Sequence, residues 1–141
     1  MKKREPVSHI MTKNVHTVNC CNDSLFDAKQ LMEKYNIRHV PVVSGEKLTG
    51  IISLTDIQRI SFGSDLGGNQ TQVDQAMIEI LSIDQVMKHE PRTVTSQTPI
   101  KEVAEQLAVE EFHALPVVNE ANELEGIVTT TDMVKYLIEQ Y

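Results

Sequence analysis

Apolar and polar residues follow two different periods along this chain. Residues 25–35 and 100–111 place apolar side chains three and four positions apart, which predicts two amphipathic helices. Segments rich in β-branched residues predict strands at residues 39–43, 48–53, 114–118 and 124–129. Further helices are predicted at residues 55–62, 73–81 and 131–140. The pattern therefore predicts a mixed α/β fold of the α+β type.

The elements recur because the chain contains an internal repeat. Residues 7–57 recur at 83–133, with an offset of 76 at both ends and 75 in the middle. Each copy has an apolar opening that ends in Met, a Thr-Val pair, a Pro-Val-Val segment and a Gly-Ile segment followed by Thr-Asp. Each copy has the predicted order β-α-β-β-α. The predicted domains are repeats at residues 7–62 and 83–138, joined by a linker at 63–82.

A single repeat is too small to bury an adequate hydrophobic core. We therefore expect the two repeats to pack through their sheets into one globule with pseudo-two-fold symmetry. Such symmetry produces equivalent clefts, and equivalent clefts predict two similar sites.

Composition restricts the possible functions. The chain has 141 residues and a formal net charge of −7, which disfavours a nucleic-acid binder that must neutralise phosphates. No run approaches the roughly 18 apolar residues of a membrane helix. Glu5-Pro6 stands where a signal peptide would continue with apolar residues. We expect a cytoplasmic protein in which Cys20 and Cys21 are reduced thiols.

Sequence signatures of enzymes are missing. The five histidines show no metal-binding spacing, and no Gly-x-Ser-x-Gly, phosphate-binding loop or Gly-x-Gly-x-x-Gly motif occurs. The prediction is a protein without catalytic residues, an obligatory cofactor or a protein-only metal site.

The ordered motifs, occurring twice from Val7 to about Leu137, resemble the tandem cystathionine-β-synthase (CBS) domain pair. This resemblance implies a stand-alone regulatory module that binds adenosine-containing ligands between the repeats. Candidate ligands are AMP, ADP, ATP and S-adenosylmethionine, with or without Mg²⁺. The resemblance also implies a homodimer.

Hydroxyl and acidic residues mark the end of a strand and the start of a helix in each copy. Backbone N–H groups at a helix start attract polar ligand atoms, whereas a carboxylate there repels phosphate and favours the hydroxyl donors of a ribose. The resemblance implies ribose contacts for the Asp and its neighbouring hydroxyls. The same spacing also fits a helix capping box, and one set of residues can serve both roles. These residues are Ser53, Thr55, Asp56, Thr129, Thr131 and Asp132.

Other candidate ligand residues lie near the predicted strands. Arg38 and His39 precede Pro41, as His113 precedes Pro116, and both prolines are candidates as well. The cations either contact phosphate or point to solvent. Since Arg38 has only a histidine as its counterpart, the two clefts should bind unequally, the Arg38 cleft favouring phosphorylated ligands. The remaining candidates either line an adenine pocket or belong to the core: Thr17, Val18, Thr93 and Val94.

The leading hypothesis is a sensor that binds an adenosine-containing ligand and signals to a partner protein of unknown identity. The alternative is a dimerisation or docking module without a physiological small ligand. A sensor in which acidic residues and ligand phosphates share Mg²⁺ is also open.

Overall fold

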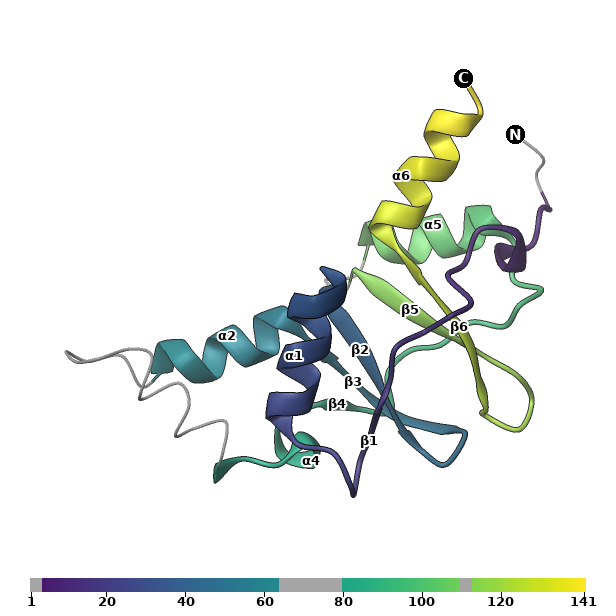
Figure 1. The fold of residues 1–141 in the computed structure, drawn as a ribbon. Helices are drawn as coiled ribbons and strands as arrows, with labels where there is room; N and C mark the ends of the chain where they lie inside the picture. Colours follow the sequence, from purple (N-terminus) through teal and green to yellow (C-terminus); the bar gives the residue numbers. More distant parts are fainter. Residues whose placement is uncertain (1–3, 64–79, 110–112) are drawn as a thin grey trace. The chain divides into compact units, whose positions relative to one another are not determined.

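The computed structural model describes residues 4–63, 80–109 and 113–141, which form two compact units. The first unit comprises residues 16–63 and 80–90, and the second unit comprises residues 4–15, 91–109 and 113–141. Both contain helices and a sheet, so the predicted mixed α/β fold is confirmed (Figure 1).

The first unit is built on a four-stranded sheet with the order β1-β2-β3-β4. Strand β1 runs parallel to β2, and the other neighbouring pairs are antiparallel. Helix α1 lies against this sheet, with Leu25, Ala28 and Met32 in the same buried cluster as strand residues Val40 and Ile52 (Figure 1). The elements are β1 (Val18–Asn19), α1 (Leu25–Tyr35), β2 (His39–Ser44), β3 (Lys47–Ser53), α2 (Leu54–Gly63), α4 (Ile83–Val86) and β4 (Lys88–His89).

The second unit repeats this plan with shorter outer strands. Its central pair β5-β6 is flanked by single bridges, where Val94 pairs parallel to Val117 and Thr12 pairs antiparallel to Ile127. Val94 and Val117 also belong to the buried cluster of this unit. The elements are the 3₁₀ turn η1 (Val7–His9), α5 (Ile100–Val109), β5 (Ala114–Val118), β6 (Leu124–Thr129) and α6 (Thr130–Glu139).

Local sequence explains where α1 begins and ends. The side chain of Ser24 accepts a hydrogen bond from the Asp27 amide at 3.2 Å, and Asp27 accepts one from the Ser24 amide at 2.8 Å. This capping box satisfies amides at the helix start that lack intrahelical partners. Asn36 ends the helix in the left-handed region at φ 52°, a conformation that asparagine adopts more readily than most residues.

The opening segments of the two repeats, residues 7–12 and 83–88, each pack in the unit that holds the sheet of the other repeat. In the second unit, the Thr12 amide donates to the Ile127 carbonyl at 2.8 Å, and the Ile127 amide donates back at 3.0 Å. In the first unit, β4 pairs with β3 in the equivalent way.

A glycine permits each of these close approaches. A Cβ atom on Gly126 would lie 2.8 Å from the Thr12 carbonyl oxygen, and one on Gly50 would lie 2.7 Å from the Lys88 carbonyl oxygen. Either distance is too short for a carbon atom. The glycine of the Gly-Ile motif is therefore required in each repeat, because the opening segment of the other repeat pairs with the strand that contains it.

The structure agrees with the predicted helices and strands to within one or two residues where both can be compared. The short helices of the opening segments, η1 and α4, and the short strand β4 were not predicted. Most of the helix predicted at 73–81, most of the linker and residues 110–111 of the predicted helix 100–111 lie outside the described residues. Within the described ranges, no helix combines the length and apolar character needed to cross a membrane.

Candidate ligand-binding site

The junction between β3 and α2 contains the hydroxyl and acidic residues singled out in the first repeat. The Ser53 amide donates to Asp56 Oδ2 at 3.0 Å, and the Asp56 amide donates to Ser53 Oγ at 3.1 Å. Both side chains are half-buried, whereas Thr55 is exposed on the first turn of α2. The capping interpretation is therefore confirmed at this junction.

The junction between β6 and α6 has the same arrangement. The Thr129 amide donates to Asp132 Oδ2 at 2.9 Å, and the Asp132 amide donates to Thr129 Oγ1 at 3.2 Å. Thr131, like its counterpart in α2, is exposed. Capping is confirmed here too.

Capping does not use all the acceptor capacity of these carboxylates. An ionised carboxylate offers about four lone-pair positions. Within the described part of the chain, Asp56 accepts one hydrogen bond, through Oδ2. Asp132 accepts two bonds at Oδ2, from the amide and hydroxyl of Thr129, and a long contact of 3.5 Å at Oδ1 from the Thr12 hydroxyl. Asp56 is therefore the more available acceptor for a ligand hydroxyl.

Strand pairing brings the predicted cations to these junctions. His39 pairs with Ser53, and the Leu54 amide donates to the Arg38 carbonyl at 2.8 Å. The Arg38 side chain is exposed and that of His39 is half-buried. In the second unit, the Thr130 amide donates to the carbonyl of His113, an exposed residue, at 3.1 Å.

The other candidate residues lie in the core or beside a different surface. Val18 and Val94 are buried members of the two core clusters, and the two strand prolines, Pro41 and Pro116, are also buried. The core interpretation therefore holds for these side chains. Thr17 and Thr93 are half-buried and each lines a groove beside a helix.

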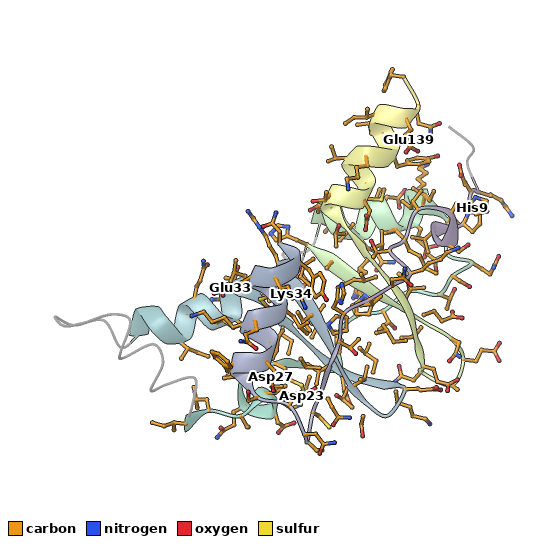
Figure 2. The ribbon with its side chains drawn as sticks, viewed as in Figure 1. His9, Asp23, Asp27, Glu33, Lys34 and Glu139 are labelled. Carbon is orange, nitrogen blue, oxygen red and sulfur yellow. The ribbon has the colours of Figure 1, made fainter. Side chains whose placement is uncertain are left out.

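The groove of the first unit lies between Thr17–Val18 and helix α1 and has a volume of about 760 Å³. Figure 2 shows Asp23 and Asp27 near the start of α1, and Glu33 and Lys34 farther along it. The equivalent groove beside Thr93 has a volume of about 500 Å³. Carboxylates outnumber cations among the lining residues of both, so neither groove favours a phosphate. The linings are Thr17, Val18, Asp23, Asp27, Gln30, Leu31, Glu33 and Lys34 in the first, and Arg92, Thr93, Glu102, Glu105, Gln106 and Val109 in the second.

Two residues near the junctions were missed by the sequence interpretation. Thr12 pairs with Ile127 and approaches Asp132, while Lys88 pairs with Ile51 at the equivalent place in the first unit. Their correspondence was present in the repeat offset, but the sequence does not show that each opening segment crosses to the other sheet. Among the residues that the structure describes, no three His, Cys, Asp or Glu side chains gather as a metal site would require.

Comparison with known proteins identifies the fold. The sequence profile of the CBS domain matches residues 7–63 and 83–139, one match for each repeat. The chain belongs to the CBS domain family. The resemblance inferred from the repeated motifs is thereby confirmed, and the protein is a tandem CBS pair.

Several relatives of this CBS pair have known structures. A Vibrio cholerae protein proposed to act in acetoin utilization (AcuB) is 32% identical, with a TM-score of 0.79 over 96% of this chain and 92% of that one. The CBS pair of protein MJ0100, solved with 5′-methylthioadenosine and S-adenosyl-L-methionine, is 25% identical, with a TM-score of 0.78 over 97% of this chain and 98% of that one.

A longer relative is the uncharacterized protein MJ1225 of Methanocaldococcus jannaschii. It is 31% identical over 135 residues, which is 95% of this chain and 48% of the relative. This CBS pair therefore spans about half the length of that protein.

Proposed function

We propose that this CBS pair is a regulatory module that binds an adenosine-containing compound at its strand–helix junctions. The observation that supports this most is the meeting of Arg38, Ser53 and Asp56 at one end of the β2–β3 hairpin. Neighbouring backbone positions thereby provide a carboxylate that can accept hydrogen bonds from ligand hydroxyls and a guanidinium that can donate hydrogen bonds to a phosphate. The complex of the MJ0100 CBS pair with two adenosyl compounds also supports this ligand class.

Each junction residue has a proposed role. The carboxylates of Asp56 and Asp132 accept hydrogen bonds from the ribose hydroxyls while they continue to cap their helices. Ser53, Thr55, Thr129 and Thr131 supply further hydroxyl contacts. Arg38 and His39 contact phosphate, so the first unit favours AMP, ADP or ATP. The second unit, which has only His113 as its counterpart, favours a compound such as S-adenosylmethionine.

The proposed action is binding and not catalysis, because no catalytic motif occurs in a chain that the two repeats largely occupy. Regulation requires the ligand to bind two states of the module with different affinity. The partner protein that responds is unidentified, and Mg²⁺ and a cytoplasmic location stay predictions. Binding between the two repeats also stays a prediction.

A second candidate function is dimerisation or docking without a physiological small ligand. Helix α6 exposes Val134, Leu137 and Ile138, which recur at helical spacing on one face. This apolar face supports the proposal of a homodimer. Sedimentation of the Ile138→Lys variant tests it, since a charge on the interface should shift the protein toward the monomer.

The first experiment is thermal melting with AMP, ADP, ATP, S-adenosylmethionine and GTP, with and without Mg²⁺. A ligand at about 100 times its dissociation constant stabilises the folded state by about 2.7 kcal/mol, which corresponds to a rise of several degrees. We expect a dose-dependent rise with adenosyl compounds and none with GTP. A flat response to every compound would leave docking as the function.

The matched variants Asp56→Asn and Asp132→Asn separate ribose binding from capping. An asparagine oxygen can still accept the backbone bond of the cap, whereas its NH₂ group cannot accept a ribose hydroxyl. We expect melting without ligand to stay unchanged and affinity to fall roughly 10- to 100-fold, from the loss of about 1.5–3 kcal/mol. Equal affinity in both variants and the wild type would contradict the ribose role.

A further inference from the structure

Cys20 and Cys21 lie next to each other in the turn that joins β1 to α1. Their Sγ atoms are 3.0 Å apart. Cys21 is exposed, and Cys20 is half-buried against the core cluster of the first unit. The pair therefore combines one thiol that reagents can reach with a second thiol held beside it.

The turn holds the two thiols in place. The Cys20 amide donates to the Val43 carbonyl at 3.0 Å, which ties this residue to β2. The Cys21 amide donates to Asn19 Oδ1 at 3.0 Å, and the Asn19 amide donates to Asp23 Oδ2 at 2.6 Å. Because the backbone is anchored around both cysteines, their closeness is a property of the folded unit.

We propose that Cys20 and Cys21 are a modification site, where a low-molecular-weight disulfide oxidises the two thiols to a reversible vicinal disulfide. The Cys21 thiolate attacks one sulfur of the small disulfide, which forms a mixed disulfide and releases one thiolate. The Cys20 thiolate then attacks Cys21 Sγ and releases the second. Two protein thiols are oxidised and one small disulfide is reduced to two thiols, so electrons and protons balance. The inference is independent of the proposed ligand.

The covalent geometry makes this disulfide easy to reduce. Neighbouring Cα atoms are about 3.8 Å apart, whereas disulfide-bonded residues usually have Cα atoms about 4.4–6.8 Å apart. The product is therefore strained, and strained, exposed disulfides are the readily reduced, regulatory kind. The hydrogen bond and charge of Cys20, with smaller contributions from burial and Asp84, raise the pKa of Cys21 above its ordinary value. The thiolate fraction is consequently small at neutral pH, which slows the attack of Cys21 on a small disulfide.

The second unit lacks this chemistry at the same place. Its equivalent turn contains Ser96 and Gln97, and it is closed by a hydrogen bond of 3.0 Å from the Thr95 amide to Thr98 Oγ1. Oxidation therefore acts on one unit only, in the turn that ends beside the groove lined by Asp23.

The test equilibrates the protein anaerobically in glutathione buffers of increasing disulfide content, followed by acid quenching, alkylation and intact mass measurement. We expect a species that has lost two hydrogens, carries neither alkyl groups nor glutathione, and returns to the dithiol with excess reduced glutathione. Stable glutathione adducts, a disulfide-linked dimer or unchanged thiols in the most oxidising buffer would each overturn the proposal.

Single-thiol variants identify the order of attack. In Cys20→Ser the mixed disulfide on Cys21 has no neighbour to resolve it, so a persistent glutathione adduct is expected. Cys20 is half-buried, so its substitution could impair folding. Cys21→Ser changes only an exposed side chain and is therefore the second variant on which the test can rely. It should leave Cys20 as a slower-reacting single thiol. An adduct that disappears from Cys20→Ser without added reductant would refute resolution by Cys20.

Discussion

The two units share one packing plan and differ in the residues placed on it. In both, an opening segment pairs with the sheet next to a glycine, Gly50 in the first unit and Gly126 in the second. In both, a capping box closes the strand–helix junction. These shared residues permit close approaches of the backbone or accept hydrogen bonds from its amides, so few other residue types can replace them.

The differences lie in side chains that the backbone does not constrain. In the second unit, the Tyr136 hydroxyl donates to Glu5 Oε1 at 3.0 Å. The residues at these positions in the first unit are Ile60 and Leu81, which pack against its core cluster. A polar link in one unit is thus replaced by apolar packing in the other.

Charge at the junctions differs in the same way. The first unit has Arg38 and Lys88 where the second has His113 and Thr12. The comparison indicates that the shared plan fixes the fold, while ligand preference and local stability depend on the variable positions.

The largest expected effect comes from the variants Gly126→Ala and Gly50→Ala, which disrupt the packing of the opening segment in each unit. A Cβ at either position collides with a backbone carbonyl of the opening segment, so that segment must move. We expect each variant to lose about 1–3 kcal/mol of unfolding free energy, as overpacked cores do. Urea denaturation measures this loss.

Hydrogen exchange locates the damage and provides the control. Gly126→Ala should speed exchange of the Thr12 and Ile127 amides, which bond each other's carbonyls. Gly45→Asn is the matched control, because Gly45 has φ 65° and open space around its Cβ position, and asparagine tolerates this conformation. If the Thr12 amide exchanged no faster in Gly126→Ala than in the wild type, the proposed effect of Gly126 on the pairing of the opening segment with β6 would be contradicted.

The next effect tests the difference in charge. Arg38→Ala should weaken binding of a phosphorylated adenosyl ligand about tenfold, from the loss of about 1.5 kcal/mol of charge-assisted hydrogen bonding. Affinity for 5′-methylthioadenosine, which has no phosphate, should not change. Isothermal titration calorimetry measures both affinities.

The reciprocal variant sharpens the same comparison. His113→Arg places a guanidinium at the second junction and should raise its affinity for phosphorylated ligands. His113→Ala is the matched control and should have little effect on them. If Arg38→Ala weakens both classes of ligand equally, Arg38 acts through local structure and not through phosphate.

Sequence periodicity predicted most of the fold because its elements are long enough to show it. Helix α1 and strands β5 and β6 have the predicted bounds. The short helix α4 is four residues long and therefore displays no helical period. Its capping box, in which Ser82 Oγ accepts from the Gln85 amide at 3.3 Å, was a detectable signal.

The candidate site was predicted in part. The spacing of Ser53 and Asp56 predicted a cap that the structure contains, while the ribose role of Asp56 stays a prediction. Thr12 and Lys88 were missed because a repeat shows which residues are equivalent, and not which sheet each opening segment joins. That choice depends on long-range pairing such as Thr12 with Ile127.

The smallest expected effect concerns the polar link in the second unit. Tyr136→Phe removes the hydrogen bond to Glu5 and leaves the ring in place, so we expect a loss of about 1 kcal/mol of unfolding free energy at neutral pH. Urea denaturation of the variant beside the wild type measures it. The matched control is Ile60→Val, which removes one methylene at the equivalent place in the first unit without touching a polar group.

Alkaline pH provides a second test of the same variant. Burial, and then the hydrogen bond to Glu5, raise the pKa of Tyr136 above its ordinary value of 10.0. The folded state thus holds this proton more tightly than the unfolded state. The stabilisation is complete below pH 10 and declines as the pH rises through the folded-state pKa. The difference in stability between wild type and Tyr136→Phe should therefore narrow above about pH 10. A constant difference, like that expected for Ile60→Val, would contradict the raised pKa of Tyr136 in the folded state.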